Sequence, residues 1–220
     1  MRTPAHQVIA IDGPAASGKS SVARGLASRL GMGWVNSGAF YRAVTWWLLS
    51  HGKPPFTEDF VREVLERTEV RVGFLDGKSF LTLDGINPLQ HLREGEVNSF
   101  VSSVSQLGVV RERVSDVLRL LACEQACVVE GRDIGTCVFP ETPFKFYVDA
   151  SPEERLRRRK AEGQEDRIAE RDKLDSQRTL APLVAAADAE RIDSTHIGIQ
   201  EVIDQILSLI EGRNAASPNQ

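Results

Sequence analysis

The sequence predicts an α/β fold in which two layers of helices cover a central, mainly parallel β-sheet. Short apolar segments, typical of buried strands, alternate along the chain with longer segments whose apolar residues recur at helical spacing. A glycine-rich loop joins the first of these strands to the first helix. One stretch departs from the alternation, because two runs flank the turn dipeptide Asp76-Gly77 and indicate a β-hairpin. We therefore expect a parallel sheet that carries a small antiparallel insertion.

The first quarter of the chain supplies strand, helix, strand and helix in that order. Residues 7–13 (QVIAIDG) are apolar and short, as in a buried strand. Residues 19–31 place apolar side chains on one helical stripe and end at Gly31. A second short strand is expected at 33–38, and an aromatic-rich helix at 39–52. This order is typical of a parallel sheet with helical crossovers.

The middle of the chain contains the hairpin and two helices. Residues 70–85 (VRVGFLDGKSFLTLDG) contain the two alternating runs on either side of the turn. Residues 96–106 are expected to be helical, and Gly108 breaks that helix. Residues 110–122 then form a second helix, because their valines and leucines fall on one face.

The last part of the chain returns to strands and helices in alternation. Residues 126–131 and 144–150 are apolar and read as buried strands. Residues 151–178 are highly charged and expected to be helical. A last strand is predicted at 190–195, and an amphipathic helix at 199–212.

The composition excludes several classes of protein. With 27 basic and 31 acidic residues, the chain has no excess of positive charge, so we expect no nucleic-acid partner. The thiols of Cys123, Cys127 and Cys137 are too few for a disulfide framework and lack the spacing of a zinc site, which predicts reduced cysteines. The sequence shows no signal peptide and no apolar run of the roughly 20 residues that span a bilayer. A cytoplasmic protein without a membrane partner is expected.

The glycine-rich loop carries the clearest functional signal. Gly13, Gly18, Lys19 and Ser20 fit the pattern Gly-x4-Gly-Lys-Ser/Thr between a predicted strand and a predicted helix. In this context, backbone N–H groups and the helix N-terminus bind phosphates, the lysine reaches the outer phosphates, and the serine hydroxyl binds Mg²⁺. The chain is therefore expected to have a P-loop NTPase fold with three αβα layers. The expected ATP-binding residues are Gly13, Pro14, Ala15, Ala16, Ser17, Gly18, Lys19, Ser20 and Ser21, with Ser20 as the metal-binding residue.

Three classes of protein use such a loop. A regulatory GTPase needs an Asn-Lys-x-Asp segment that reads guanine, and the sequence has none. A motor or transport ATPase usually couples to further domains, whereas this chain has the length of one compact unit. A small-molecule kinase needs a second, cationic pocket for the acceptor, and the arginines outside the loop favour this class. A kinase with another acceptor, such as UMP, and a non-catalytic nucleotide switch remain as alternatives.

Three further motifs resemble those of the bacterial cytidylate kinases. They are NSGAFYR at 36–42, EGRDIGTCVFP at 130–140, and ERDKLDSQR at 170–178 followed by APLVAAADAERIDST. The resemblance runs from about residue 7 to 211. It implies transfer of the γ-phosphoryl group of ATP to CMP or dCMP with Mg²⁺, by a P-loop nucleoside monophosphate kinase that acts as a monomer.

The same resemblance implies how the chain is divided. A single kinase domain would occupy residues 6–212, with an acceptor-binding insert at about 60–108 and a short helical lid at about 153–178. The predicted hairpin falls within this insert. Residues 213–220 would form a disordered tail.

The resemblance also implies the acceptor-binding residues. Ser37 would lie near the base, Arg42 on the monophosphate, and Arg132 on the α-phosphate. Asp133 would accept a hydrogen bond from the cytosine amino group. The family commonly has Asp where this chain has Asn36, so one charge near the acceptor is absent.

The remaining implied residues come from the insert and the lid. Ser102 and Arg111 match the family's insert serine and its base-reading arginine. Arg171 and Asp175 would reach the sugar, and Arg178 the transferring phosphate or the base. The residues expected to act in catalysis are Lys19, Arg132, Arg171 and Arg178.

Elementary chemistry supports these roles, although each segment has a simpler interpretation. Cytosine presents an amino donor beside two acceptors, so a carboxylate and an arginine can read that edge, whereas the uracil carbonyl would repel the carboxylate. Arg171, Asp175 and Arg178 share one helix face by their spacing, which also suits a solvated surface helix with internal ion pairs. The GRD segment alone is equally typical of a turn after a strand, and Arg42 alone of a side chain whose stem covers an aromatic helix.

Overall fold

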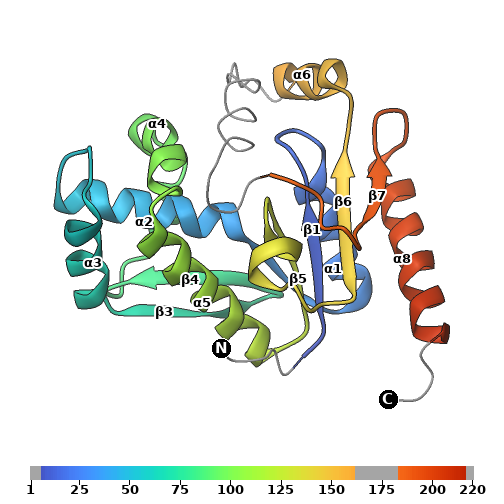
Figure 1. Cartoon of the computed structure of the whole chain (residues 1–220), viewed down its shortest axis with the longest axis horizontal. Coiled ribbons are helices and arrows are strands. Elements are labelled where there is room, and N and C mark those ends of the chain that lie inside the picture. Colours follow the sequence, from blue (N-terminus) through green and yellow to red (C-terminus); the bar gives the residue numbers. More distant parts are fainter. Residues whose placement is uncertain (1–5, 162–182, 217–220) are drawn as a thin grey trace.

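One β-sheet of seven strands forms the centre of the molecule in this computed structural model, which describes residues 6–161 and 183–216 (Figure 1). The strands are β1 (Val8–Asp12), β2 (Gly33–Asn36), β3 (Val70–Leu75), β4 (Lys78–Leu83), β5 (Cys127–Gly131), β6 (Phe144–Asp149) and β7 (Glu190–Asp193). Their order across the sheet is β3-β4-β2-β5-β1-β6-β7. Strands β2, β5, β1, β6 and β7 pair in parallel, which confirms the predicted sheet.

The parallel register brings the ends of the central strands to the same edge. Asp12, the last residue of β1, lies opposite Gly131 of β5 and Tyr147 of β6. The loop after β1 and the turn after β5 therefore leave the sheet side by side. In open α/β sheets, ligands bind outside the carboxyl ends of the parallel strands, which is where this loop and this turn lie.

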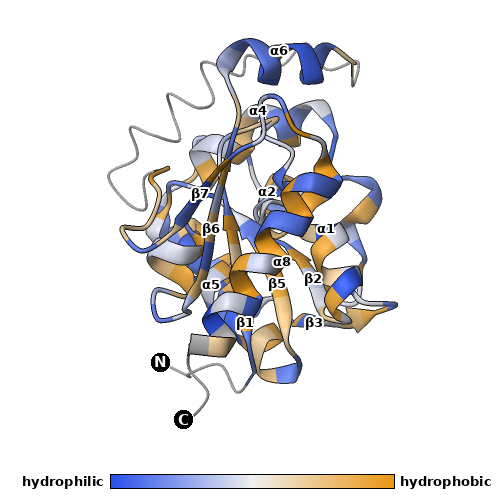
Figure 2. Ribbon diagram, turned by 90° about the vertical axis from the view of Figure 1, so that its right-hand side faces the viewer, coloured by the Kyte–Doolittle hydropathy of each residue, from blue (hydrophilic) through white to orange (hydrophobic). Residues whose placement is uncertain are grey.

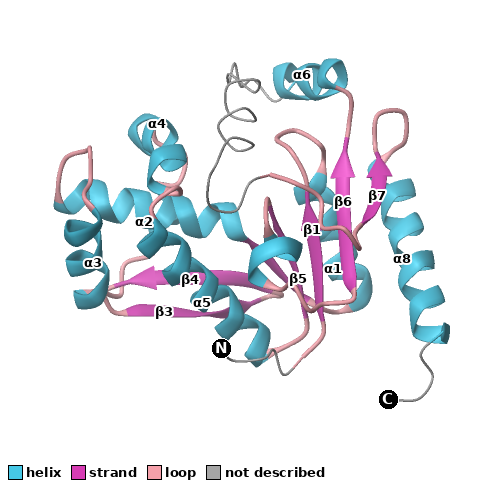
Figure 3. Cartoon of the chain, in the orientation of Figure 1, coloured by secondary structure: helices cyan, strands magenta, loops and turns pink. Residues whose placement is uncertain are grey.

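The predicted hairpin is present and extends the same sheet. Strands β3 and β4 pair antiparallel around Asp76 and Gly77, whose φ angles of 50° and 70° suit the tight turn. The hairpin joins the parallel strands through the pair Trp34 and Lys78. Figure 3 shows its two strands leading away from the parallel strands, toward one end of the molecule.

Helices cover both faces of the sheet. They are α1 (Lys19–Leu30), α2 (Ser37–His51), α3 (Glu58–Arg67), α4 (Gly95–Val104), α5 (Gly108–Glu124), α6 (Pro152–Ala161) and α8 (Ile199–Ala216), with short turns η1 (Pro88–Gln90) and η2 (Ile134–Val138). Successive residues of β1 point to opposite faces, as in any strand. Val8 and Ala10 join a core with α2 and α5, whereas Ile9 and Ile11 join one with α1 and α8. The three-layer prediction is thereby confirmed.

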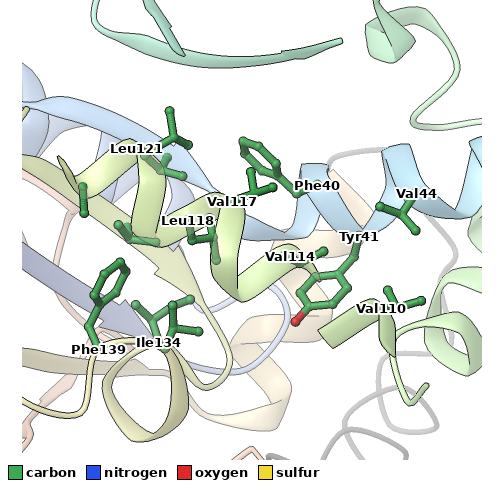
Figure 4. Packing of buried hydrophobic residues seen from close by; sticks show 14 of the residues in the cluster. Phe40, Tyr41, Val44, Val110, Val114, Val117, Leu118, Leu121, Ile134 and Phe139 are labelled. Carbon is green, nitrogen blue, oxygen red and sulfur yellow. The ribbon is translucent and has the colours of Figure 1, made fainter. Parts of the chain in front are cut away.

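Helices α2 and α5 pack against each other in the core on one face of the sheet. Figure 4 shows Phe40, Tyr41 and Val44 of α2 beside Val114 and other apolar residues of α5. Burial of such side chains contributes about 1.5–3 kcal/mol each. In Figure 2 the colours change from mostly hydrophobic in the central strands to hydrophilic along α6, so α6 is a polar surface helix.

The helices differ from the sequence prediction in two places, and one predicted break is confirmed. Helix α3 was not predicted, although Thr57 caps it and Val61 and Leu65 bury one face. The break at Gly108 is confirmed, and Gly108 is the first residue of α5. The prediction that disorder begins at residue 213 is wrong, because α8 continues to Ala216.

The longer last helix has a structural cause. The Arg213 guanidinium donates hydrogen bonds to the carbonyl of Pro143 and, at 2.9 Å, to Oε1 of Glu190. These contacts tie the last turns of α8 to the sheet. Residues 162–182, which include most of the predicted lid at about 153–178, and residues 217–220 lie outside the described residues. None of the described helices combines the length and apolarity that a bilayer crossing needs.

Candidate active site

The loop after β1 has the backbone of a phosphate-binding loop. Gly13 and Gly18 have φ angles of +153° and +87°, a region that favours glycine. A Cβ atom on Gly13 would lie 2.1 Å from the carbonyl oxygen of Val148, so only glycine fits there. Helix α1 begins at Lys19, directly after the loop. The predicted order of strand, loop and helix is confirmed.

Two of the predicted catalytic cations contact carbonyl oxygens of this loop. Nζ of Lys19 donates to the carbonyl of Pro14 at 2.9 Å, and Lys19 is 9% exposed. Nη1 of Arg132, from the turn after β5, donates to the carbonyl of Gly13 at 2.8 Å. Both cations therefore lie where a phosphate chain in the loop would attract them.

Helix α6 adds two arginines that the sequence analysis did not assign. Nη1 of Arg155 donates to the carbonyl of Ala15 at 3.4 Å, and Nη1 of Arg158 to that of Ser17 at 3.1 Å. Arg158 also bonds to Ser194 after β7. Their spacing of three residues within a strongly basic helix was the available signal.

A buried carboxylate faces the loop from β5. Glu130 is 2% exposed, and its Oε2 accepts a hydrogen bond of 2.5 Å from Oγ of Ser20, the predicted metal-binding residue. Burial raises the pKa of Glu130, whereas Lys19, Ser20 and Arg132 act in the opposite direction. Sequence analysis missed this residue, although an acidic side chain in an otherwise apolar strand was a visible signal.

The two predicted base-reading residues form a buried ion pair. Nη2 of Arg111 on α5 contacts Oδ2 of Asp133, and the side chains are 9% and 4% exposed. Nη1 of Arg111 also donates to the carbonyl of Ser105 at 3.1 Å. The guanidinium lies 5.7 Å from the ring centroid of Tyr41. A planar cation and a carboxylate are thus held together beside an aromatic ring.

The predicted phosphate-binding residue on α2 is held by the insert. Nη1 of Arg42 donates to Oδ1 of Asn98 at 2.6 Å and to the carbonyl of Leu92 at 2.9 Å. Both acceptors lie outside α2, in or just before α4. Arg42 therefore links α2 to the insert.

The serines of the predicted site occupy two places. Ser37 is buried at the start of α2, and a Cβ atom on Gly131 would lie 2.6 Å from its Oγ, so it adjoins the end of β5. Ser102 is half-buried on α4, and Arg111 lies on the next helix, α5. Asn36 caps α2 by accepting from the amide of Ala39 at 3.2 Å, a role that needs no charge.

The lid residues Arg171, Asp175 and Arg178 lie outside the described residues. The remaining predicted residues lie around the carboxyl ends of β1, β2 and β5 and on α4 and α5. They comprise a phosphate-binding loop with its lysine and a second group of charged residues built around Arg132, Asp133 and Arg111.

The fold has three layers, and the phosphate-binding loop follows strand β1 at the centre of its sheet. Several cations converge on this loop. Together these features define a P-loop nucleotide-binding protein of the phosphotransferase class. Sequence comparison places the chain within that class. Residues 9–212 match the cytidylate kinase family, and this chain belongs to it.

Full-length relatives agree with this assignment. A cytidylate kinase of Streptomyces avermitilis is 37% identical over 98% of this chain and 97% of its own length. That of Caldicellulosiruptor bescii is 38% identical, over 91% and 94% respectively. That of Shouchella clausii is 39% identical, over 92% and 95%. The similarity therefore extends over nearly the whole chain.

Proposed function

We propose that this chain transfers the γ-phosphoryl group of ATP to CMP or dCMP, giving ADP and CDP or dCDP. The observation that carries the proposal is the contact between Arg132 and Gly13, which joins the phosphate loop to the turn that bears Asp133. The phosphate loop and the Arg111–Asp133 pair thus lie near each other, beyond the carboxyl ends of β1 and β5.

The donor occupies the loop. The backbone N–H groups of residues 15–18 and the N-terminus of α1 surround its phosphates, and Lys19 leaves the carbonyl of Pro14 to contact the outer ones. Arg155 and Arg158 bring further positive charge to the loop from α6. Their role is to neutralise the charge that spreads over the phosphates during transfer.

The residues at the loop suit a Mg²⁺ ion. Ser20 offers a hydroxyl oxygen, and Glu130 offers a buried carboxylate whose Oε2 accepts a hydrogen bond from that hydroxyl. Hard oxygen ligands of this kind fit magnesium, which also keeps water and phosphate oxygens in its shell. When bound, the ion screens the negative charge of the phosphates. Ser20 and Glu130 are the residues that would hold it, directly or through water.

The acceptor lies against Arg132 and Arg42. Its phosphate has a second pKa near 6, so it is mostly ionised at neutral pH and needs no general base. The difficulty is repulsion between two polyanions, which the arginines offset while they align the reacting oxygen with the γ-phosphorus. Arg171, Asp175 and Arg178 complete the sugar and phosphate contacts in this proposal. Closure of the lid that carries these residues would exclude water as a competing acceptor.

The Arg111–Asp133 pair selects the base. The Asp133 carboxylate accepts from the 4-amino group of cytosine, and the Arg111 guanidinium donates to the ring acceptors. Uracil presents a carbonyl at position 4, which repels the carboxylate. The family resemblance also implies a monomer, which remains our prediction.

An acceptor panel tests the proposal. ADP formation from ATP and Mg²⁺ is measured with CMP, dCMP, UMP, AMP and GMP at equal concentration. We expect CMP and dCMP to react at least about a hundredfold faster than the purine nucleotides, since a site built to hydrogen-bond one base leaves buried groups unpaired with another. Equal rates with all five would contradict base selection. ATP hydrolysis that no monophosphate changes would instead support a nucleotide switch.

A further inference from the structure

The carboxylate of Asp12 uses both of its oxygens on the segment that follows Arg132 and Asp133. Oδ1 accepts from the amide of Ile134 at 2.9 Å, and Oδ2 from the amide of Gly135 at 2.7 Å. These are the first two amides of η2, which have no partner within the helical turn itself. Asp12 is 4% exposed and lies at the end of the central strand. It thus fixes the start of η2 from the base of the phosphate loop.

A second contact runs in the opposite direction. Arg132 donates to the carbonyl of Gly13, the residue after Asp12. The backbones of Asp12 and Gly131 are also paired in register between β1 and β5. Three contacts therefore join residues 12–13 to residues 131–135: those of the Asp12 carboxylate, the paired backbones of β1 and β5, and the Arg132 side chain. The donor loop and the acceptor turn are linked through this one junction.

Asp12 carries out this task against an electrostatic cost. Burial raises the pKa of Asp12 to about 6 and Asp133 adds to the rise, whereas the two amides and Lys19 lower it. A neutral side chain would avoid that cost. A carboxylate differs from an amide of the same shape in one respect that matters here: both of its oxygens accept hydrogen bonds, whereas one end of the amide is an NH₂ group that only donates.

We propose that Asp12 is a positioning residue for the acceptor: its carboxylate fixes Arg132 and Asp133 relative to the phosphate loop. The inference rests on the proposed function, because it concerns where CMP lies before transfer. Asp12 touches neither substrate in this account. It acts by holding the backbone between the arginine that contacts the acceptor phosphate and the carboxylate that reads the base.

The test compares Asp12→Asn with a matched control. Asparagine keeps the shape but directs an N–H group at one of the two amides. The control is Thr68→Val, because Thr68 is equally buried and accepts from Trp47 Nε1 at 2.7 Å, far along the chain from the site residues. For the wild type and both variants, the KM for CMP, the KM for ATP and the ratio of CMP to UMP turnover are measured. Hydrogen exchange of the amides of residues 134 and 135 is followed in parallel.

The proposal predicts a split between the two substrates. Asp12→Asn should raise the KM for CMP and lower the CMP preference by about tenfold or more, with the KM for ATP changed less than about threefold. Thr68→Val should leave all three unchanged. Asp12 would have only a structural role if both variants behaved alike, or if the KM values for CMP and ATP rose equally.

Failure of the proposed function would be recognised separately. In that case the wild type itself would not phosphorylate CMP. The Asp12 proposal would then be judged by hydrogen exchange, which must accelerate at residues 134 and 135 in Asp12→Asn and not in the control. Unchanged exchange there would overturn it.

Discussion

Breaking the Arg111–Asp133 pair should destabilise the whole domain and not only the acceptor site. The perturbation is Arg111→Met, which keeps an apolar stem and removes the guanidinium. Asp133 is 4% exposed at its side chain, so the change removes the arginine partner of a buried carboxylate. Loss of one partner from a buried ion pair costs about 3–5 kcal/mol.

The expected shift is large enough to measure without ambiguity. For a domain of this length, each kcal/mol lowers the midpoint of thermal unfolding by about 2–4 °C. The predicted fall is therefore about 6–20 °C, with a matching loss in the free energy of unfolding from urea titration. The control is Arg67→Met, because Arg67 forms an exposed pair with Glu63 at 2.9 Å and its removal should cost no more than about 1 kcal/mol.

A double variant separates stability from function. Arg111→Met combined with Asp133→Leu removes both charges, and should regain most of the lost stability because no unpaired charge remains buried. Its turnover with CMP should stay as low as that of the single variants. Additive losses in the double variant, or a loss below about 1 kcal/mol in Arg111→Met, would refute the reasoning.

Three further predictions concern the loop and its surroundings. Gly13→Ala should lower the free energy of unfolding, measured by urea titration, by about 3 kcal/mol or more, because the new Cβ meets the carbonyl oxygen of Val148 at 2.1 Å. The control is Gly77→Ala, because nothing lies within 4 Å of a Cβ atom there. It should lose only the roughly 1 kcal/mol that a left-handed backbone costs alanine. Glu130→Gln should raise the Mg²⁺ concentration for half-maximal activity about tenfold, and an unchanged magnesium titration would remove Glu130 from the metal site. The raised pKa of Asp12, about 6 against 3.8, means that the folded state binds more protons than the unfolded state between pH 4 and 6, so ionisation of Asp12 lowers stability by about 3 kcal/mol as the pH rises to 7. The free energy of unfolding of Asp12→Asn, minus that of the wild type, should therefore rise by about 2–3 kcal/mol from pH 4 to pH 7. A difference that does not vary with pH would contradict the assigned cause.

Local patterns in the sequence were sufficient to predict the phosphate-binding loop and most of the helices and strands. The sequence around Gly13 and Lys19 contains the whole strand, loop and helix within a short stretch, so its geometry follows from neighbouring residues. Helix α3 was also predictable, since Thr57 is a capping residue and two acidic residues follow it. It was overlooked between a proline-rich turn and the hairpin, whose signals are stronger.

Contacts between segments far apart in the chain could not be predicted from the sequence. Ser20 and Glu130 lie 110 positions apart, and Asp12 and Ile134 lie 122 apart. Their proximity depends on the parallel register of β1 and β5, which no local pattern specifies. Arg111 and Asp133 were each assigned to the base through the family resemblance, but their ion pair was not predicted, because the two residues belong to separate elements.

The end of the last helix shows the same limit. Residues 213–216 look like the start of a polar tail, yet Arg213 reaches Glu190 on β7 and the helix continues. A tertiary contact overrides the local signal there. Single-residue boundaries of this kind are the least secure part of any reading from sequence.

A crystal structure with CMP and a non-hydrolysable ATP analogue tests the central claim most directly. The account predicts that the guanidinium of Arg132 leaves the carbonyl of Gly13 for the acceptor phosphate, while Asp133 contacts the cytosine amino group. CMP bound elsewhere, with Arg132 and Arg111 in their present contacts, would contradict it.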